Sequence, residues 1–95
     1  MTTKKLYLIC YDIQKDKARN KIAELLSDNG KRINYSVFEC FITETKLQKI
    51  KNEIETLCNE KTDYIKIYPI CQTCYSKSLI IGNEAYSIQN HSIFI

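Results

Sequence analysis

The feature that most restricts the fold is the alternation of strand-like apolar runs with two segments of helical periodicity in only 95 residues. Apolar side chains recur at helical spacing in residues 16–29 and again after Thr43. Four runs are rich in β-branched and aromatic side chains and are typical of strands: residues 5–11, 31–42, 63–70 and 78–82. We interpret the order as βαββαβ, which predicts a ferredoxin-like α+β domain with one four-stranded antiparallel sheet.

The ends of the two predicted helices carry recognisable signals. Asp16 is a plausible N-cap of the first helix, and Gly30 stands where that helix should stop. Thr43 can cap the second helix, whose apolar stripe consists of Leu47, Ile50, Ile54 and Leu57.

The first strand is apolar on both of its faces. Leu6, Leu8 and Cys10 lie on one face, and Tyr7, Ile9 and Tyr11 lie on the other. A sheet covered by helices on one side only should be polar on its other side. The sequence therefore predicts a homodimer in which a second copy covers the open face of the sheet.

The last residues form a separate segment. We expect a ferredoxin-like domain over residues 1–82 and a C-terminal tail over residues 83–95 at the dimer interface. The tail ends on Ile93, Phe94 and Ile95, an apolar end that pairing would stabilise. We expect it to add a strand to the partner's sheet edge, and the alternative is a tail packed on its own domain.

Five cysteines are scattered through mostly apolar segments, which indicates reduced core thiols rather than a disulfide framework. Cys71 and Cys74 have the spacing of a metal or redox pair. No second pair completes a four-ligand zinc site, and no helical pattern follows them, as a redox pair would normally require. We expect a turn with two half-buried thiols there.

The net charge of +3 is modest, but the positive residues are clustered. Lys15, Lys17, Arg19 and Lys21 fall within seven residues, and Lys31 and Arg32 follow the first helix. This cluster predicts contact with a nucleic-acid backbone, and the alternative is a solvated helix face. No apolar run approaches the roughly 20 residues that cross a bilayer, so we expect a cytoplasmic protein without membrane contact.

Asp12 ends the first apolar strand and is the main candidate for chemistry. Alone, a carboxylate in this position is an ordinary turn cap. In a face-to-face dimer, Asp12 can meet its own copy, and two carboxylates would repel each other unless a cation lay between them. A Mg²⁺ ion suits such a pair and could activate water at a phosphodiester.

Four pieces of the sequence, in order between about residues 5 and 82, carry a family resemblance: "YLICYDI", "DKARNKIAELL", "GKRINYSVFEC" and "IKIYPIC". Together they resemble the CRISPR-associated protein Two family, the small adaptation subunit of CRISPR systems, whose members are described as endonucleases. The resemblance implies a ferredoxin-like homodimer in which Asp12 binds a divalent metal with its partner's copy. It implies nucleic-acid contacts by Arg19, Arg32 and Phe38, with Tyr11 and Ser36 as neighbours in the same motifs.

The resemblance leaves two functions of different classes open. One is a Mg²⁺-dependent endonuclease acting on RNA or DNA. The other is a structural adaptor, a dimer that binds DNA or RNA and bridges the CRISPR integrase during spacer acquisition. A toxin-like endoribonuclease of the same fold is a more distant alternative. We favour the adaptor role, because one acid per chain is a sparse catalytic apparatus.

Overall fold

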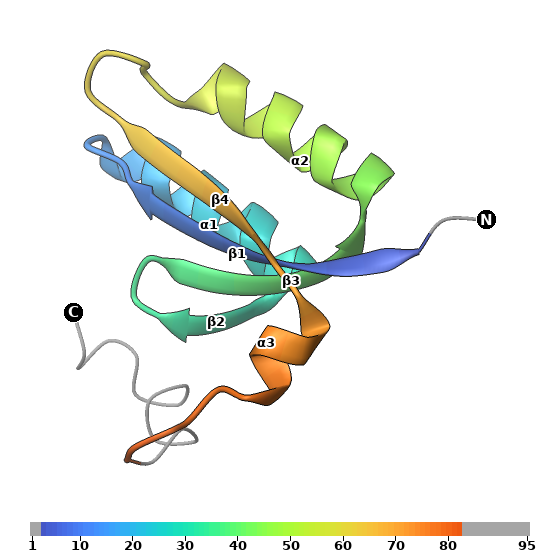
Figure 1. Ribbon diagram of the computed structural model, residues 1–95. Coiled ribbons are helices and arrows are strands. Elements are labelled where there is room, and N and C mark those ends of the chain that lie inside the picture. Colours follow the sequence, from blue (N-terminus) through green and yellow to red (C-terminus); the bar gives the residue numbers. More distant parts are fainter. Residues whose placement is uncertain (1–2, 83–95) are drawn as a thin grey trace.

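The computed structural model describes residues 3–82 of the chain. Its elements are β1 (Lys4–Asp12), α1 (Asp16–Asn29), β2 (Lys31–Asn34), β3 (Val37–Thr43), α2 (Glu44–Leu57), β4 (Tyr64–Ile70) and the short helix α3 (Gln72–Ser76). The four strands form one antiparallel sheet in the order β2-β3-β1-β4 (Figure 1). The first six elements confirm the predicted ferredoxin-like βαββαβ order.

Strand β1 lies in the middle of the sheet, between β3 and β4. Its odd-numbered residues Tyr7, Ile9 and Tyr11 are buried among side chains of both long helices, including Ile22 and Ile50. Its even-numbered residues lie on the other side and are only half-buried or exposed. The two faces of the first strand are therefore assigned as the sequence alternation predicted, and the helices cover one of them.

The segment 31–42 is a hairpin of two strands rather than one continuous run. Tyr35 and Ser36 form the turn between β2 and β3, and the register shifts between Arg32 and Asn34. Asn34 supports the turn by accepting a hydrogen bond on its side chain from the Tyr35 backbone N–H at 2.7 Å. This hairpin supplies the second and third strands of the βαββαβ order, whereas the predicted runs, each counted as one strand, placed one strand between the helices and two after the second helix.

The expected strand at residues 78–82 is wrong: this segment has no strand structure. Leu79 and Ile81 are 89% and 98% exposed, so neither side chain packs on the described part of the domain. The chain forms α3 directly after β4, and residues 78–82 follow that helix without joining either edge of the described sheet. The expected tail strand and the tail boundary fall on residues 83–95, outside the described residues.

The expected turn at Cys71 and Cys74 is also corrected. Cys71 is the N-cap of α3, Cys74 lies within that helix, and both thiols are exposed rather than half-buried. Tyr75 of α3 donates a hydrogen bond through its hydroxyl to Glu39 Oε1 at 3.3 Å. Glu39 belongs to the uncovered face of β3, so α3 crosses back over part of that face (Figure 1).

The helix ends agree with the sequence except at one position. The N-cap of α1 is Lys15, not Asp16, which is the first helical residue and pairs with Arg19. An acidic side chain in the first turn is favoured there by the partial positive charge of the helix N-terminus. Thr43 caps α2 as predicted, because its Oγ1 accepts a hydrogen bond from the Lys46 N–H at 3.1 Å. None of the helices in residues 3–82 is long and apolar enough to cross a membrane.

Gly30 ends α1 as predicted and lies against β3. A Cβ atom at this position would overlap the backbone carbonyl of Glu39 and the buried sulfur of Cys40. The absence of a side chain therefore lets the chain leave α1 in close contact with β3.

We expect Gly30→Ala to destabilise the fold, because the added methyl group meets backbone that cannot move independently of the sheet. The cost should be about 1–3 kcal/mol, typical of overpacking. Urea unfolding followed by circular dichroism measures it. Ser27→Ala, at an exposed position of the same helix, is the control and should leave the midpoint almost unchanged.

Candidate metal and nucleic-acid site

Asp12 is the last residue of β1 and lies on the uncovered face of the sheet. Its side chain is exposed, and its cross-strand neighbour in β4 is Tyr64, which is 56% exposed. Within residues 3–82 the Asp12 carboxylate makes no hydrogen bond or ion pair. A strand-end carboxylate held by the backbone of a central strand, but not used in local pairing, is available to a ligand or to a second chain.

The backbone around Asp12 is fixed from two sides. The N–H of Tyr11 donates to the carbonyl of Ser36 at 3.1 Å, which ties the end of β1 to the β2–β3 turn. Beyond the strand, the N–H of Gln14 donates to Oδ1 of Asp63 at 2.9 Å. Ser36 therefore lies beside the end of β1, and its contact there is made by its backbone carbonyl.

Asp63 is a positioning residue that the sequence analysis missed. Its other oxygen accepts from the N–H of Asn59 at 2.7 Å, so one carboxylate joins the loop after α2 to the loop after β1. These backbone N–H groups, Asn59 first and Gln14 second, lower the pKa of Asp63, and Lys15 adds a smaller effect. An Asp immediately before a strand was the only local signal for this role.

Arg32, Tyr11 and Phe38 do form a cluster, but on the side of the sheet that the helices cover. The Tyr11 and Phe38 rings stack with centroids 6.2 Å apart, and both residues are buried. The Arg32 guanidinium lies 5.2 Å from the Phe38 centroid and donates to the Tyr11 hydroxyl at 3.4 Å. Its Nε is buried without a hydrogen-bond partner in the described part of the chain. Phe38 is therefore a core residue in this chain.

Arg19 is engaged within the loop that follows Asp12. Its guanidinium donates to the carbonyl of Ile13 at 2.9 Å and pairs with the carboxylate of Asp16. This clamp shapes the connection between β1 and α1. Arg19 therefore helps to hold the backbone next to Asp12, and its Nη1 and Nη2 groups already have partners.

The structure divides the predicted basic cluster. Lys15 and Lys17 are exposed at the start of α1, and Lys15 is close enough to Asp63 to influence its pKa. Lys21 instead lines a hollow between α1 and α2 together with the acidic residues Glu24, Asp28 and Glu53. Lys15 and Lys17 are therefore exposed cations at the start of the helix that follows Asp12, and Lys21 belongs to the helix layer.

The single carboxylate of Asp12 supplies only half of the protein ligands in the expected site for a divalent cation. In residues 3–82 no group of three or more His, Cys, Asp or Glu side chains gathers in a way that could hold a metal. Mg²⁺ is commonly held by one or two carboxylates with several waters and substrate oxygens. One exposed carboxylate agrees with that donor set provided that a second one comes from another chain.

The βαββαβ order, with helices on one face of the sheet and a strand-end acid on the other, defines a ferredoxin-like α+β domain. Its family follows from sequence comparison: the model of the family described as CRISPR associated protein Cas2 matches residues 5–78, and the chain belongs to this family.

A relative from Rhodospirillum rubrum, named CRISPR-associated endoribonuclease Cas2 4, is 42% identical over 76 residues. The match covers 80% of this chain but only 61% of that relative, so the chain spans less than two thirds of the relative's length.

Two solved structures share the fold. The Streptococcus pyogenes Cas2 crystal structure at pH 6.5 aligns with a TM-score of 0.72 and 29% identity, over 81% of this chain and 99% of that one. A chain of a partial Cas6-RT-Cas1–Cas2 complex aligns with a TM-score of 0.69 and 32% identity, over 81% of this chain and 90% of that one.

The role of Asp63 leads to a pH-dependent prediction for Asp63→Asn. The pKa of Asp63 is lowered in the folded state, so its charge stabilises the fold above the ordinary value of 3.8 and loses this effect as pH falls through the folded-state pKa. Asp63→Asn should lower the urea midpoint at neutral pH, and the difference from wild type should shrink as pH drops below 3.8.

Asp28→Asn removes a negative charge from an exposed position of α1 and serves as the control. An equal loss of stability in both variants at neutral pH would show that overall charge, rather than the Asp63 hydrogen bonds, explains the effect.

Proposed function

We propose that this protein is a subunit of the CRISPR adaptation machinery that acts as a homodimer through the uncovered face of its sheet. The observation that carries the proposal is the apolar character of that face. Leu8, Cys10 and Val37 are half-buried there, and Phe41 is 49% exposed. A monomer rarely leaves so many apolar side chains together on one face, and a two-fold pair of sheets would cover them.

The proposed dimer would place the Asp12 carboxylate beside the same carboxylate of the second copy. Asp12 lies at the strand end that borders the same face, so a two-fold axis through the face can bring both copies together. The proximity of two negative carboxylates would favour binding of a cation such as Mg²⁺ between them. Sharing the metal between chains accounts for the single carboxylate in each.

A second proposed activity, cleavage of RNA or DNA phosphodiesters, is favoured by the Asp12 carboxylate, which is exposed and has no partner within residues 3–82. Mg²⁺ bound there would supply a Lewis acid and a means of lowering the pKa of water. Asp12 would hold the metal, while Lys15 and Lys17 would hold the phosphate backbone without reading sequence. The Rhodospirillum rubrum relative is named an endoribonuclease, which supports this activity.

The adaptor role requires nucleic acid and a larger partner. One solved relative is a chain of a complex that also contains Cas1, which supports assembly with the CRISPR integrase. We place the adaptor role first, because one carboxylate per chain with no described basic group hydrogen-bonded to it is little apparatus for catalysis.

The dimer is tested by Phe41→Glu. This residue is half exposed, so the substitution should leave the monomer folded while placing two charges against each other in the proposed interface. Sedimentation equilibrium at micromolar concentration should give twice the chain mass for wild type and the single chain mass for the variant. Lys49→Glu, exposed on α2, should remain dimeric. A monomeric wild type would contradict the proposal.

Asp12→Asn separates the two activities. Under the nuclease proposal, Mg²⁺-dependent cleavage of RNA or DNA should fall by at least about 10²-fold because the substituted amide no longer provides the negative charge that favours the metal. Under the adaptor proposal, the same variant should still support spacer integration with the integrase.

Circular dichroism and sedimentation confirm that the Asp12→Asn variant keeps its fold and dimer. Cleavage that persists unchanged would exclude Asp12 as the site of catalysis, and loss of integration in a folded dimer would contradict a purely structural role.

A further inference from the structure

The junction between β4 and α3 carries a pair of thiols that the proposed function does not use. Cys71 leaves the strand and caps α3, and Cys74 follows three residues later in the first helical turn. The turn is fixed by a hydrogen bond from the Tyr75 N–H to the Cys71 carbonyl at 2.9 Å. Both cysteines are exposed, whereas Cys40 is buried in the core. Side chains at this spacing on a helical turn are neighbours.

The surroundings of Cys71 favour its thiolate form. The backbone N–H groups of Cys74 and Thr73 lower the pKa of the Cys71 thiol, and the side chains of Thr73 and Cys74 add smaller effects in the same direction. By contrast, burial raises the pKa of Cys40 to about 11 and also raises that of Cys58. Among these thiols, Cys71 is the one placed to act as a nucleophile.

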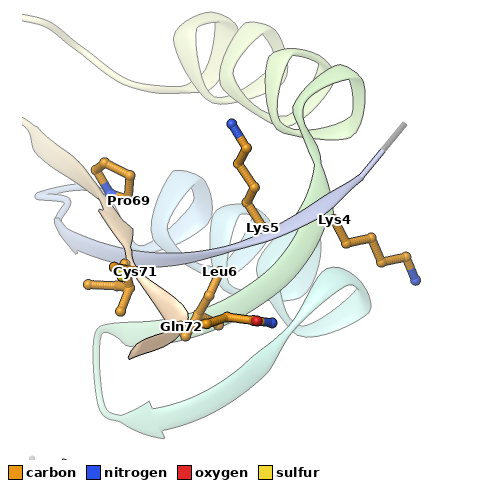
Figure 2. A pocket seen from close by; sticks show the side chains of 7 residues that line it. Lys4, Lys5, Leu6, Pro69, Cys71 and Gln72 are labelled. Carbon is orange, nitrogen blue, oxygen red and sulfur yellow. The ribbon is translucent and has the colours of Figure 1, made fainter. Parts of the chain in front are cut away.

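A reagent can reach Cys71 from a hollow of about 500 Å³ beside the end of β4. Figure 2 shows Cys71 and Gln72 near Leu6 of β1, with the amino groups of Lys4 and Lys5 pointing away from the cysteine. Leu6, together with Pro69 and Ile70, makes the walls on this side largely apolar. The hollow therefore admits a small molecule whose aliphatic part can lie against these side chains.

We propose that Cys71 and Cys74 form a thiol–disulfide exchange site that takes low-molecular-mass aliphatic disulfides as oxidants. Three observations carry the proposal: the spacing of the two thiols across the strand-to-helix junction, the exposure of both thiols, and the open hollow next to Cys71. The site is independent of Asp12 and of the proposed nuclease or adaptor function.

The exchange proceeds in two balanced steps. The Cys71 thiolate attacks one sulfur of the small disulfide, whose S–S bond breaks and releases one thiolate that takes up a proton. Cys74 then loses its proton to solvent and attacks the Cys71 sulfur of the mixed disulfide. The second small thiolate leaves and is protonated. The pair has become a disulfide, and one small disulfide has been reduced to two thiols.

A zinc site is the competing interpretation of this pair. A structural zinc ion usually takes four ligands, and the described part of one chain offers two thiols here with no third Cys, His, Asp or Glu grouped with them. The single-chain geometry therefore favours exchange chemistry, and metal binding by two chains becomes an outcome that the experiment must detect.

The test uses the full-length protein, freed of metal by a chelator and exposed to excess oxidised glutathione. Tryptic residues 67–77 contain both cysteines of the pair and no other cysteine. Mass spectrometry should show this peptide with two hydrogen atoms fewer, which identifies an internal disulfide. The peptides that contain Cys40 and Cys58 should stay reduced.

Two variants identify the separate roles. Cys74→Ser should retain glutathione on Cys71, because the resolving thiol is missing. Cys71→Ser should react more slowly with glutathione, by about tenfold if the lowered pKa matters to the extent usual for such pairs. Because both positions are exposed, neither variant should lose stability. Alkylation of Cys71 should also be faster in the folded chain than in urea at neutral pH.

The same reaction is carried out on the Phe41→Glu variant. It shows whether a second copy of the chain shields the two thiols or whether the thiols are themselves unreactive. An internal disulfide in either protein supports the site, and its absence from both overturns it. Stoichiometric zinc that protects both thiols of the untreated protein from alkylation would replace the exchange site with a metal site. Failure of the dimer or of Asp12-dependent cleavage would leave this result unaffected.

Discussion

The insertion of β1 between β3 and β4 is the constraint on which the rest of the structure depends. It pairs with both neighbours along almost its whole length, from Leu6↔Phe41 and Leu6↔Ile70 to Asp12↔Tyr64. This pairing holds one set of side chains in the helix-covered core and presents the other set on the uncovered face. The strand-end acid and the loop to α1 both take their positions from this strand.

Much of the fold could be predicted because β1, α1, α2 and β4 carry strong periodicity and, at Thr43 and Gly30, clear end signals. The turn at Tyr35 and Ser36 was harder to see, since it contains neither Gly nor Pro and interrupts a run rich in β-branched and aromatic residues. A helix of five residues such as α3 is too short to show a period. An apolar segment such as 78–82 indicates burial or pairing somewhere, without showing which edge is available.

The position of Asp12 at the end of the first strand could be predicted, and its surroundings less so, because the positive residues differ in their three-dimensional surroundings. Arg19 contacts the Ile13 carbonyl and Asp16, and Arg32 packs on Phe38 under the helices. Sequence spacing shows that such residues are close along the chain, but not which face they occupy or which acceptors they already have. Asp63 was missed for the same reason, since its partner Gln14 is 49 residues away.

The strict alternation along β1 has a consequence for how such a chain tolerates change. Substitutions at single positions affect one face, but deletion of one residue between Leu6 and Tyr11 would exchange the faces of everything on one side of the deletion. Asp12 would then be directed into the core, or the tyrosines out of it. Insertions and deletions should accordingly concentrate in the loops and beyond β4. The number of residues between Leu6 and Asp12 in β1 should stay constant.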